Sequence, residues 1–218
     1  TRLLQQKKYS EAVSVYNNLI QKREDLQQVY YGRASAYIGL RRINEAINDY
    51  STSLSFGETA QTLASRCNAY RMYMELDKAV QDCRAAAALD PASADVQVAL
   101  SFILLEKGDY DESETVVNTL IAGFPDNAMA YFVLARLQMA KGPSEKALDS
   151  LTKAIQLDPK QPQFYWERGF LYYSNGMPAE AKADMETLLK IADPAVDGEL
   201  MLQAGTLLRM VAGSQGDQ

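Results

Sequence analysis

Apolar residues recur along the chain every three or four positions, and the runs are separated by short breaks. In residues 128–161, one run ends at Gly142-Pro143, and a second is built on Ala147, Leu151 and Ala154. Side chains at this spacing share one face of a helix, whereas glycine and proline interrupt helices. Each such segment therefore predicts two amphipathic helices joined by a turn, and the chain as a whole is predicted to be all-α.

This pair of helices repeats along the chain. A small residue recurs every 33 or 34 residues in the second helix of each pair, at Ala12, Ala46, Ala79, Ser113, Ala147 and Ala181. The first helices share another small position, occupied by Ala34, Cys67, Ser101, Ala135 and Gly169. Helices that cross closely need small side chains at the point of contact. Spacing this regular indicates an internal repeat of helix pairs.

The details of the repeat resemble the tetratricopeptide (TPR) repeat. The resemblance rests on the 34-residue period, the two small positions, the turn Gly108-Asp109-Tyr110 and ends such as Leu89-Asp90-Pro91. The family phrase Trp-x-x-Leu-Gly-x-x-Tyr is best matched by the segment from Tyr165 to Tyr172. Three repeats depart from that phrase at its leucine position, which holds Arg33, Arg66 and Arg168.

The resemblance covers about residues 1–195 and implies the fold. It implies a right-handed α-solenoid of stacked helix-turn-helix repeats with a C-terminal capping helix. We divide the chain into a partial repeat and five full ones, followed by a capping helix and tail: 1–26, 27–59, 60–93, 94–127, 128–161, 162–195 and 196–218. From Ala212 onward the tail is rich in glycine and polar residues, and we expect it to fray. Because the first repeat lacks the start of its first helix, we expect further chain before Thr1.

Composition narrows the classes of function. The chain has no histidine, which excludes Ser-His-Asp triads, Cys-His dyads and histidine-ligated zinc sites. The net charge is −6, and it arises in residues 110–218, because residues 1–109 carry equal numbers of acidic and basic side chains. An acidic balance disfavours nucleic acid, whose binding depends on neutralising phosphates. We therefore predict a protein that is not an enzyme, needs no cofactor or metal and binds no nucleic acid.

The resemblance also implies a binding surface, because first helices line a concave groove in TPR solenoids. Carried over position by position, the groove is predicted to be apolar and to hold the only tryptophan of the chain. We expect partner contacts from Tyr31, Ile38, Met72, Val98, Phe102, Leu105, Phe132, Arg136, Met139, Trp166, Phe170 and Tyr173. A large apolar patch left after internal packing marks an interaction surface. The predicted function is a scaffold that binds an apolar or amphipathic segment of a partner protein.

Two alternatives to a partner groove remain open at this stage. The same apolar side chains would also suit a self-associating solenoid, a homo-oligomer, or burial within a larger multi-protein complex. A helical-repeat RNA binder is disfavoured by the 34-residue register and by the acidic C-terminal half. The carboxylate clamp of TPR co-chaperones requires lysine, and the matching positions, Gln61, Ala64, Ser65, Asn68 and Asp95 among them, hold none.

The sequence says less about the redox state of the two cysteines and about the cellular compartment of the protein. Cys67 and Cys83 face each other on the two helices of one repeat, so a disulfide is conceivable, but we favour two buried free thiols. The longest apolar runs are only a few residues, which predicts no membrane insertion. We expect a soluble protein, either cytoplasmic or, if a leader has been removed, periplasmic or exported.

Overall fold

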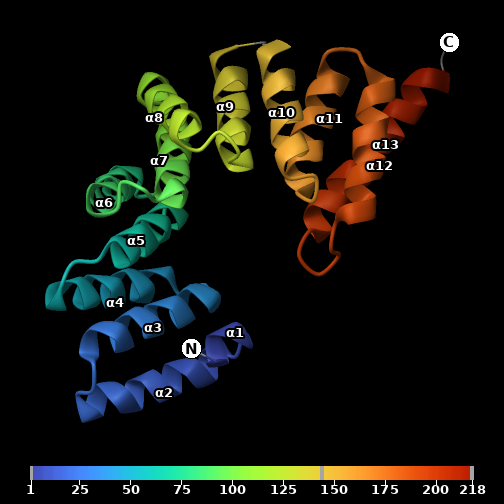
Figure 1. Cartoon of the computed structure of the whole chain (residues 1–218). Helices are drawn as coiled ribbons and strands as arrows, with labels where there is room; N and C mark the ends of the chain where they lie inside the picture. Colours follow the sequence, from blue (N-terminus) through green and yellow to red (C-terminus); the bar gives the residue numbers. More distant parts are fainter. Residues whose placement is uncertain (1, 143–144, 217–218) are drawn as a thin grey trace. The chain divides into compact units, whose positions relative to one another are not determined.

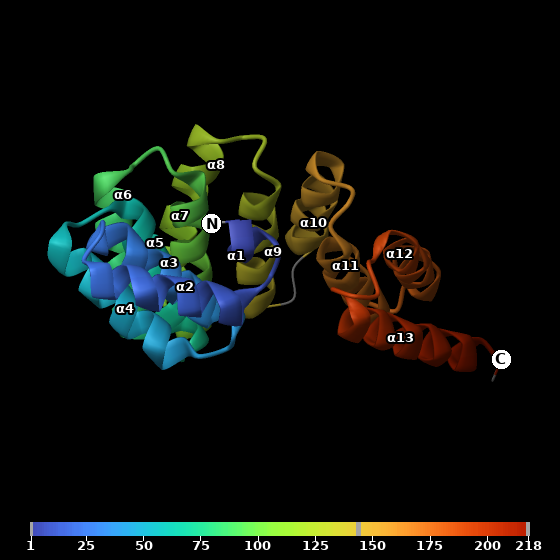
Figure 2. The ribbon, with the colours of Figure 1, turned by 90° about the horizontal axis from the view of Figure 1, so that it is seen from below.

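The fold is all-helical, as the sequence predicts. A computed structural model describes residues 2–142 and 145–216, and these residues form thirteen helices and no strand. The contacts divide the chain into two compact units, residues 1–116 and 117–218, which we describe separately. Figures 1 and 2 show the helices in chain order.

The first unit consists of helix pairs followed by part of an eighth helix. Its helices are α1 (Arg2–Gln5), α2 (Tyr9–Lys22), α3 (Leu26–Gly39), α4 (Ile43–Phe56), α5 (Ala60–Met72), α6 (Leu76–Leu89) and α7 (Ala94–Lys107). The unit boundary falls inside α8 (Tyr110–Gly123). Consecutive helices from α2 to α7 pack on one another, and α5 also contacts α7.

The second unit repeats this pairing and ends in a longer helix. It contains α9 (Ala128–Lys141), α10 (Glu145–Leu157), α11 (Pro162–Ser174), α12 (Pro178–Ile191) and α13 (Gly198–Gly216). The last helix packs against both α11 and α12, as Figure 2 shows. It extends to Gly216, so residues 212–216 are helical and our expectation that the tail frays from Ala212 was wrong for them. The helix continues because no proline interrupts this segment.

The small residues lie at the closest points between helices. All six of the recurring second-helix residues are at least 98% buried. On the first helices, Gly169 shows the reason, since a Cβ atom placed there would lie only 2.5 Å from Cε of Met185 on α12. Met185 is sixteen positions further along the chain. A methyl group at residue 169 would therefore displace the end of the Met185 side chain and crowd Cβ of Asp184, which would lie 3.1 Å away.

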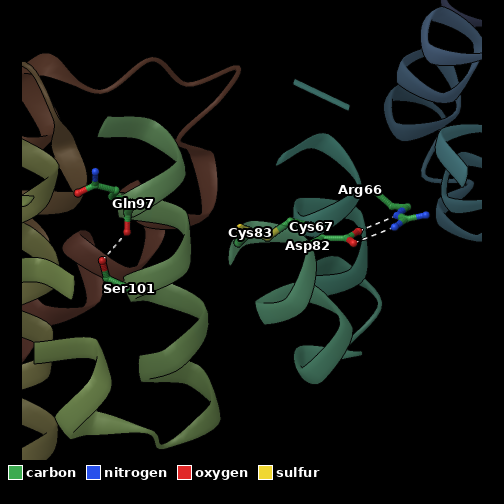
Figure 3. Close-up of a disulfide and its surroundings, with 6 residues drawn as sticks. All are labelled: Arg66, Cys67, Asp82, Cys83, Gln97 and Ser101. Atoms are coloured by element: carbon green, nitrogen blue, oxygen red, sulfur yellow. Dashed lines mark hydrogen bonds and ion pairs between the residues drawn. A yellow bond between two sulfur atoms is a disulfide. The ribbon is translucent and has the colours of Figure 1, made fainter. Parts of the chain in front are cut away.

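Cys67 and Cys83 occupy the same contact in the pair α5/α6, and they are joined by a disulfide (Figure 3). Their Cα atoms are 5.5 Å apart and both residues are fully buried. Our preference for free thiols was therefore wrong. The sequence places the two residues opposite each other, but a spacing that brings small residues together is equally compatible with either state.

The turns within the helix pairs share one hydrogen-bonding scheme. A residue of left-handed backbone follows the first helix, at Arg41, Met74, Gly108 and Gly176 among others. In each of these four cases, the N–H of the next residue donates to a carbonyl of the first helix, for example Glu75 N to Tyr70 O at 2.9 Å. This arrangement satisfies carbonyls that the helix end would leave without a partner.

An arginine–aspartate ion pair ties the first helix to the second in three pairs. Nε and Nη2 of Arg66 donate to both carboxylate oxygens of Asp82, at 2.6 and 2.8 Å, as Figure 3 shows. Arg33 forms the same bidentate pair with Asp49, and Arg168 forms it with Asp184. Both partners are largely buried, and the hydrogen bond to Asp82 raises the pKa of Arg66 although burial opposes this.

The third guanidinium nitrogen reaches the preceding helix pair. Nη1 of Arg66 donates to Ser51 Oγ on α4 at 3.0 Å, and Nη1 of Arg168 donates to Thr152 Oγ1 on α10 at 3.0 Å. Nη1 of Arg33 donates to Asn17 Oδ1 on α2 at 2.7 Å. Each arginine thus links three helices through one planar group, which a lysine at the same position lacks the geometry to do.

One helix pair replaces the ion pair by apolar residues, which supplies a test. In the pair α7/α8, Leu100 occupies the position of Arg66 and Val116 that of Asp82. Leu100 is buried in a hydrophobic core cluster, and Val116 packs against the same cluster. Removing one member of a buried pair leaves an uncompensated charge. Asp82→Val should therefore destabilise the chain by about 2–4 kcal/mol, measured as a shift in urea unfolding, since the pair is partly accessible to solvent.

The matched control is Arg66→Leu with Asp82→Val, which copies the apolar pair of the chain itself. This double variant should recover most of the lost stability, because no unpaired charge remains. A double variant no more stable than Asp82→Val would contradict this account of the ion pair.

The disulfide should also contribute measurably to stability. It closes a segment of sequence separation 16, for which the chain-entropy estimate is about 3 kcal/mol. Cys67→Ala with Cys83→Val, which preserves a small residue facing an apolar one, should unfold at lower urea concentration than the oxidised chain and match the reduced chain. Alkylation of the unfolded protein without reductant should add no mass, and addition of two alkyl groups would show that the bond is absent.

Candidate functional site

Residues of α11 and α13 form an apolar hollow in the second unit. It has a volume of about 300 Å³. Its lining consists of Trp166, Phe170, Tyr173, Leu202, Gln203, Thr206, Leu207 and Met210. We call it the α11/α13 hollow.

Helical spacing explains why these side chains meet. Trp166, Phe170 and Tyr173 lie four and three positions apart on α11, so they share one face of that helix. Leu202, Thr206 and Met210 follow a four-residue spacing on α13. The small residues of α11 face α12, as Gly169 against Met185 shows, which leaves the aromatic face of α11 to the C-terminal helix.

Several of these apolar side chains are accessible to solvent. Phe170 is 49% exposed, Leu202 68% and Met210 50%. The rings of Trp166 and Phe170 are stacked, with centroids 5.9 Å apart and planes inclined by 28°. Exposed apolar area of this kind is costly in water, and its burial by a partner releases about 25 cal/mol for each Å².

Three of the twelve predicted groove residues therefore lie together, namely Trp166, Phe170 and Tyr173. Two others are buried in the packing between helices: Leu105 is 9% exposed, and Phe132 is 3% exposed. The ring of Phe132 packs against the ring of Phe164 on α11, with the two ring centroids 4.9 Å apart. We expected Leu105 and Phe132 to line an accessible groove. Because both are buried, neither side chain is accessible to a partner in this structure.

The other predicted residues of the second unit are half-buried on α9. Nε of Arg136 lies 3.9 Å from Oε1 of Glu167 on α11, which places a charged pair next to Trp166 in the sequence. Met139 is half-buried near the end of α9. These two residues do not line the α11/α13 hollow.

In the first unit, the predicted residues fall on α3, α5 and α7. Tyr31 packs on Tyr50 of α4, and the hydroxyl groups of Tyr31 and Ser65 are 3.4 Å apart. Burial raises the pKa of the Tyr50 hydroxyl, which lies 3.3 Å from Ser35 Oγ. Ile38 packs against the same cluster, Val98 and Phe102 are half-buried, and Met72 is 41% exposed at the end of α5.

Sequence reasoning missed the contribution of α13. We expected this helix to be a cap, and a cap presents a polar outer face. Instead, Leu202 and Met210 leave apolar surface next to the aromatic residues of α11. The spacing of residues 202, 206 and 210 was a usable signal, because it places two exposed apolar side chains on one face.

Family models confirm the type of repeat. A model described as TPR repeat matches residues 135–176, and two described as tetratricopeptide repeat match residues 75–137 and residues 27–56 and 162–193. The chain belongs to the tetratricopeptide repeat family. The predicted repeat and the helical solenoid fold are thereby confirmed.

Known proteins share parts of the sequence or the fold. The human protein O-mannosyl-transferase TMTC1 is 28% identical over 127 residues, which cover 58% of this chain and 14% of that protein. A tetratricopeptide repeat protein from Parabacteroides merdae has the same fold, with a TM-score of 0.77 and 23% identity, covering 96% of this chain and 80% of that one. The Yersinia enterocolitica type III secretion chaperone SycD, solved with a peptide of the translocator YopD, gives a TM-score of 0.53 and 19% identity, covering 58% and 98%.

These similarities establish less about the function of this chain than about its fold. The two structures are less than 25% identical to this chain and show the fold alone. The stretch matched in the transferase is about a seventh of that enzyme. Among the described residues, none of the helices has the length and apolarity that a bilayer crossing requires.

Proposed function

We propose that the chain is a non-catalytic scaffold that binds an apolar or amphipathic segment of a partner protein. The observation that carries this proposal is the α11/α13 hollow, where stacked aromatic rings on one helix and exposed apolar side chains on the next line an open surface. Nearly all of that lining is apolar, so the matching group on a partner is apolar too. Aromatic side chains of this kind dominate the energetics of protein interfaces.

The dimensions of the hollow suit a short helical or extended segment. A volume of about 300 Å³ accommodates one or two large apolar side chains. Side chains at residues 166, 170 and 173 continue over two helical turns, and an amphipathic helix presents anchors at a similar spacing. Binding in this mode would bury the exposed faces of Phe170, Leu202 and Met210.

The neighbouring structure of SycD supports the same class of function. That chaperone holds a peptide of another protein and shares the repeat fold with this chain. TPR repeats are scaffolds in themselves, and the relative that is a transferase matches over a small fraction of its length. We therefore propose binding rather than catalysis for this chain.

A second candidate is self-association through the same surface. The observation that favours it is the 68% exposure of Leu202 on the C-terminal helix, which a second copy of the chain would cover. Sedimentation velocity over a hundredfold range of concentration separates the two candidates. Self-association would be favoured if the mass of the wild-type chain doubles as its concentration rises while the Leu202→Asp variant keeps the mass of a monomer.

Phe170→Ala tests the partner-binding proposal, and the chain offers a matched control. Phe56 is 51% exposed and stacks on Tyr30 at 6.2 Å, much as Phe170 is 49% exposed and stacks on Trp166 at 5.9 Å. Partners are first captured from a lysate on the wild-type chain, and their affinities are then measured by calorimetry. Phe170→Ala should weaken binding by about thirtyfold, the effect of losing an interface anchor.

The control Phe56→Ala should bind as the wild type does. Both variants lose a half-exposed ring, so their melting temperatures should fall by similar, small amounts. Equal binding by Phe170→Ala and wild type would refute the hollow as the partner site. A large drop in melting temperature for Phe170→Ala alone would instead place this residue in the core.

A further inference from the structure

A second hollow lies in the first unit, between α5 and α7, and its chemistry differs from that of the first. Its volume is about 320 Å³. It is lined by Ala60, Gln61, Ala64, Ser65, Asn68, Asp90, Ser93, Asp95 and Val96. We call it the α5/α7 hollow. These residues come from α5, from the turn that leads into α7 and from the first turn of α7 itself.

Most polar side chains of this hollow have no hydrogen-bonding partner among the residues that the structure describes. Across residues 2–142 and 145–216, the side chains of five lining residues make no hydrogen bond or ion pair: Gln61, Asn68, Asp90, Ser93 and Asp95. Ser93 precedes α7 but forms no cap hydrogen bond through its hydroxyl. Gln61, Asn68, Asp90 and Asp95 are exposed, so a ligand that offers hydrogen bonds to them would take the place of solvent.

The lining has many acceptors and carries negative charge. Two carboxylates, two amide oxygens and two hydroxyls accept hydrogen bonds, whereas only the amides and hydroxyls donate. No lining residue is basic. Arg71, also on α5, is engaged with Glu106 of α7, with Nη1 to Oε1 at 3.0 Å. The N-terminal dipole of α7 offsets about half a charge, so the hollow keeps a negative balance.

We propose that the α5/α7 hollow binds the cationic side chain of an arginine in a partner segment. A guanidinium group has five donors and no acceptor, which complements a lining of acceptors with two carboxylates. Arginine is favoured over lysine because its planar donors can engage Asp90 or Asp95 and an amide oxygen together.

The proposal rests on the proposed function, because it names one chemical feature of the partner segment. It reverses the charge of the carboxylate clamp, in which lysines receive a peptide carboxylate. Here aspartates would receive a peptide cation, at groove positions that the repeat register had already assigned to Gln61, Asn68 and Asp95.

The test uses short alanine peptides that differ only in a central residue. The ¹⁵N-labelled full chain is titrated with a peptide carrying arginine and with one carrying citrulline, which has the same shape without the charge. The arginine peptide should shift amide resonances of residues 60–68 and 93–96, and saturate at about 1–10 mM, as expected for one weak ion pair. The citrulline peptide should bind at least about fivefold more weakly.

Variants of the carboxylates provide the control. Asp90→Asn with Asp95→Asn should remove the preference for arginine over citrulline, because it removes charge and keeps shape. Asp126→Asn, an exposed carboxylate in the loop before α9, should leave the preference intact. Equal shifts with both peptides, an unchanged preference in the Asp90/Asp95 variant, or no shift in the hollow at about 10 mM would each overturn the proposal.

The outcome is separable from that of the proposed function. If the captured partner depends on Phe170 but binds the Asp90/Asp95 variant as it binds wild type, and the peptides show no preference for arginine, then the cation site fails and the scaffold function stands. If the arginine preference holds but no partner depends on Phe170, the α5/α7 hollow remains a cation site and the α11/α13 hollow loses its assigned role.

Discussion

The fold depends on one close contact, between residues sixteen positions apart on the two helices of a pair. This contact joins Cys67 to Cys83 and places Gly169 against Met185. The neighbouring residues at the same separation form the ion pairs of Arg66 with Asp82 and Arg168 with Asp184. Small or covalently bonded residues allow the helices to approach, and the adjacent ion pair fixes their register. The arginine also donates a hydrogen bond to the preceding helix pair, which links neighbouring pairs.

This contact also determines which faces of the first helices remain uncovered. One face of each first helix is used against its own second helix, so aromatic residues on another face must pack elsewhere or stay exposed. Phe132 packs on Phe164, whereas Phe170 stays half-exposed beside α13. Apolar surface therefore remains exposed where the next helix does not cover an aromatic face. That occurs at the C-terminal helix, whose own apolar side chains are also uncovered.

The repetition of helix pairs could be predicted from sequence because it depends on local spacing. The recurring alanines, the turn residues and the resemblance to TPR repeats all report on contacts within one pair, and the structure places them as expected. Burial of Leu105 and Phe132 could not be predicted, because it depends on which neighbouring side chain reaches them. The ion pairs were also missed: Arg33, Arg66 and Arg168 were seen as departures from the family pattern, although each has an aspartate sixteen residues later. The unpaired polar side chains of the α5/α7 hollow are visible only when α5 and α7 are placed side by side.

The central claim is that the uncovered aromatic face beside α13 is the surface at which a partner binds. Site-specific photo-crosslinking in cells tests it most directly, with a benzophenone residue placed at Tyr173 in the α11/α13 hollow or at Lys182, an exposed residue of α12 outside it. We expect irradiation to give a discrete adduct with another protein from position 173 and none from position 182. Adducts from position 182 alone, or an adduct from position 173 that contains only a second copy of this chain, would contradict the claim.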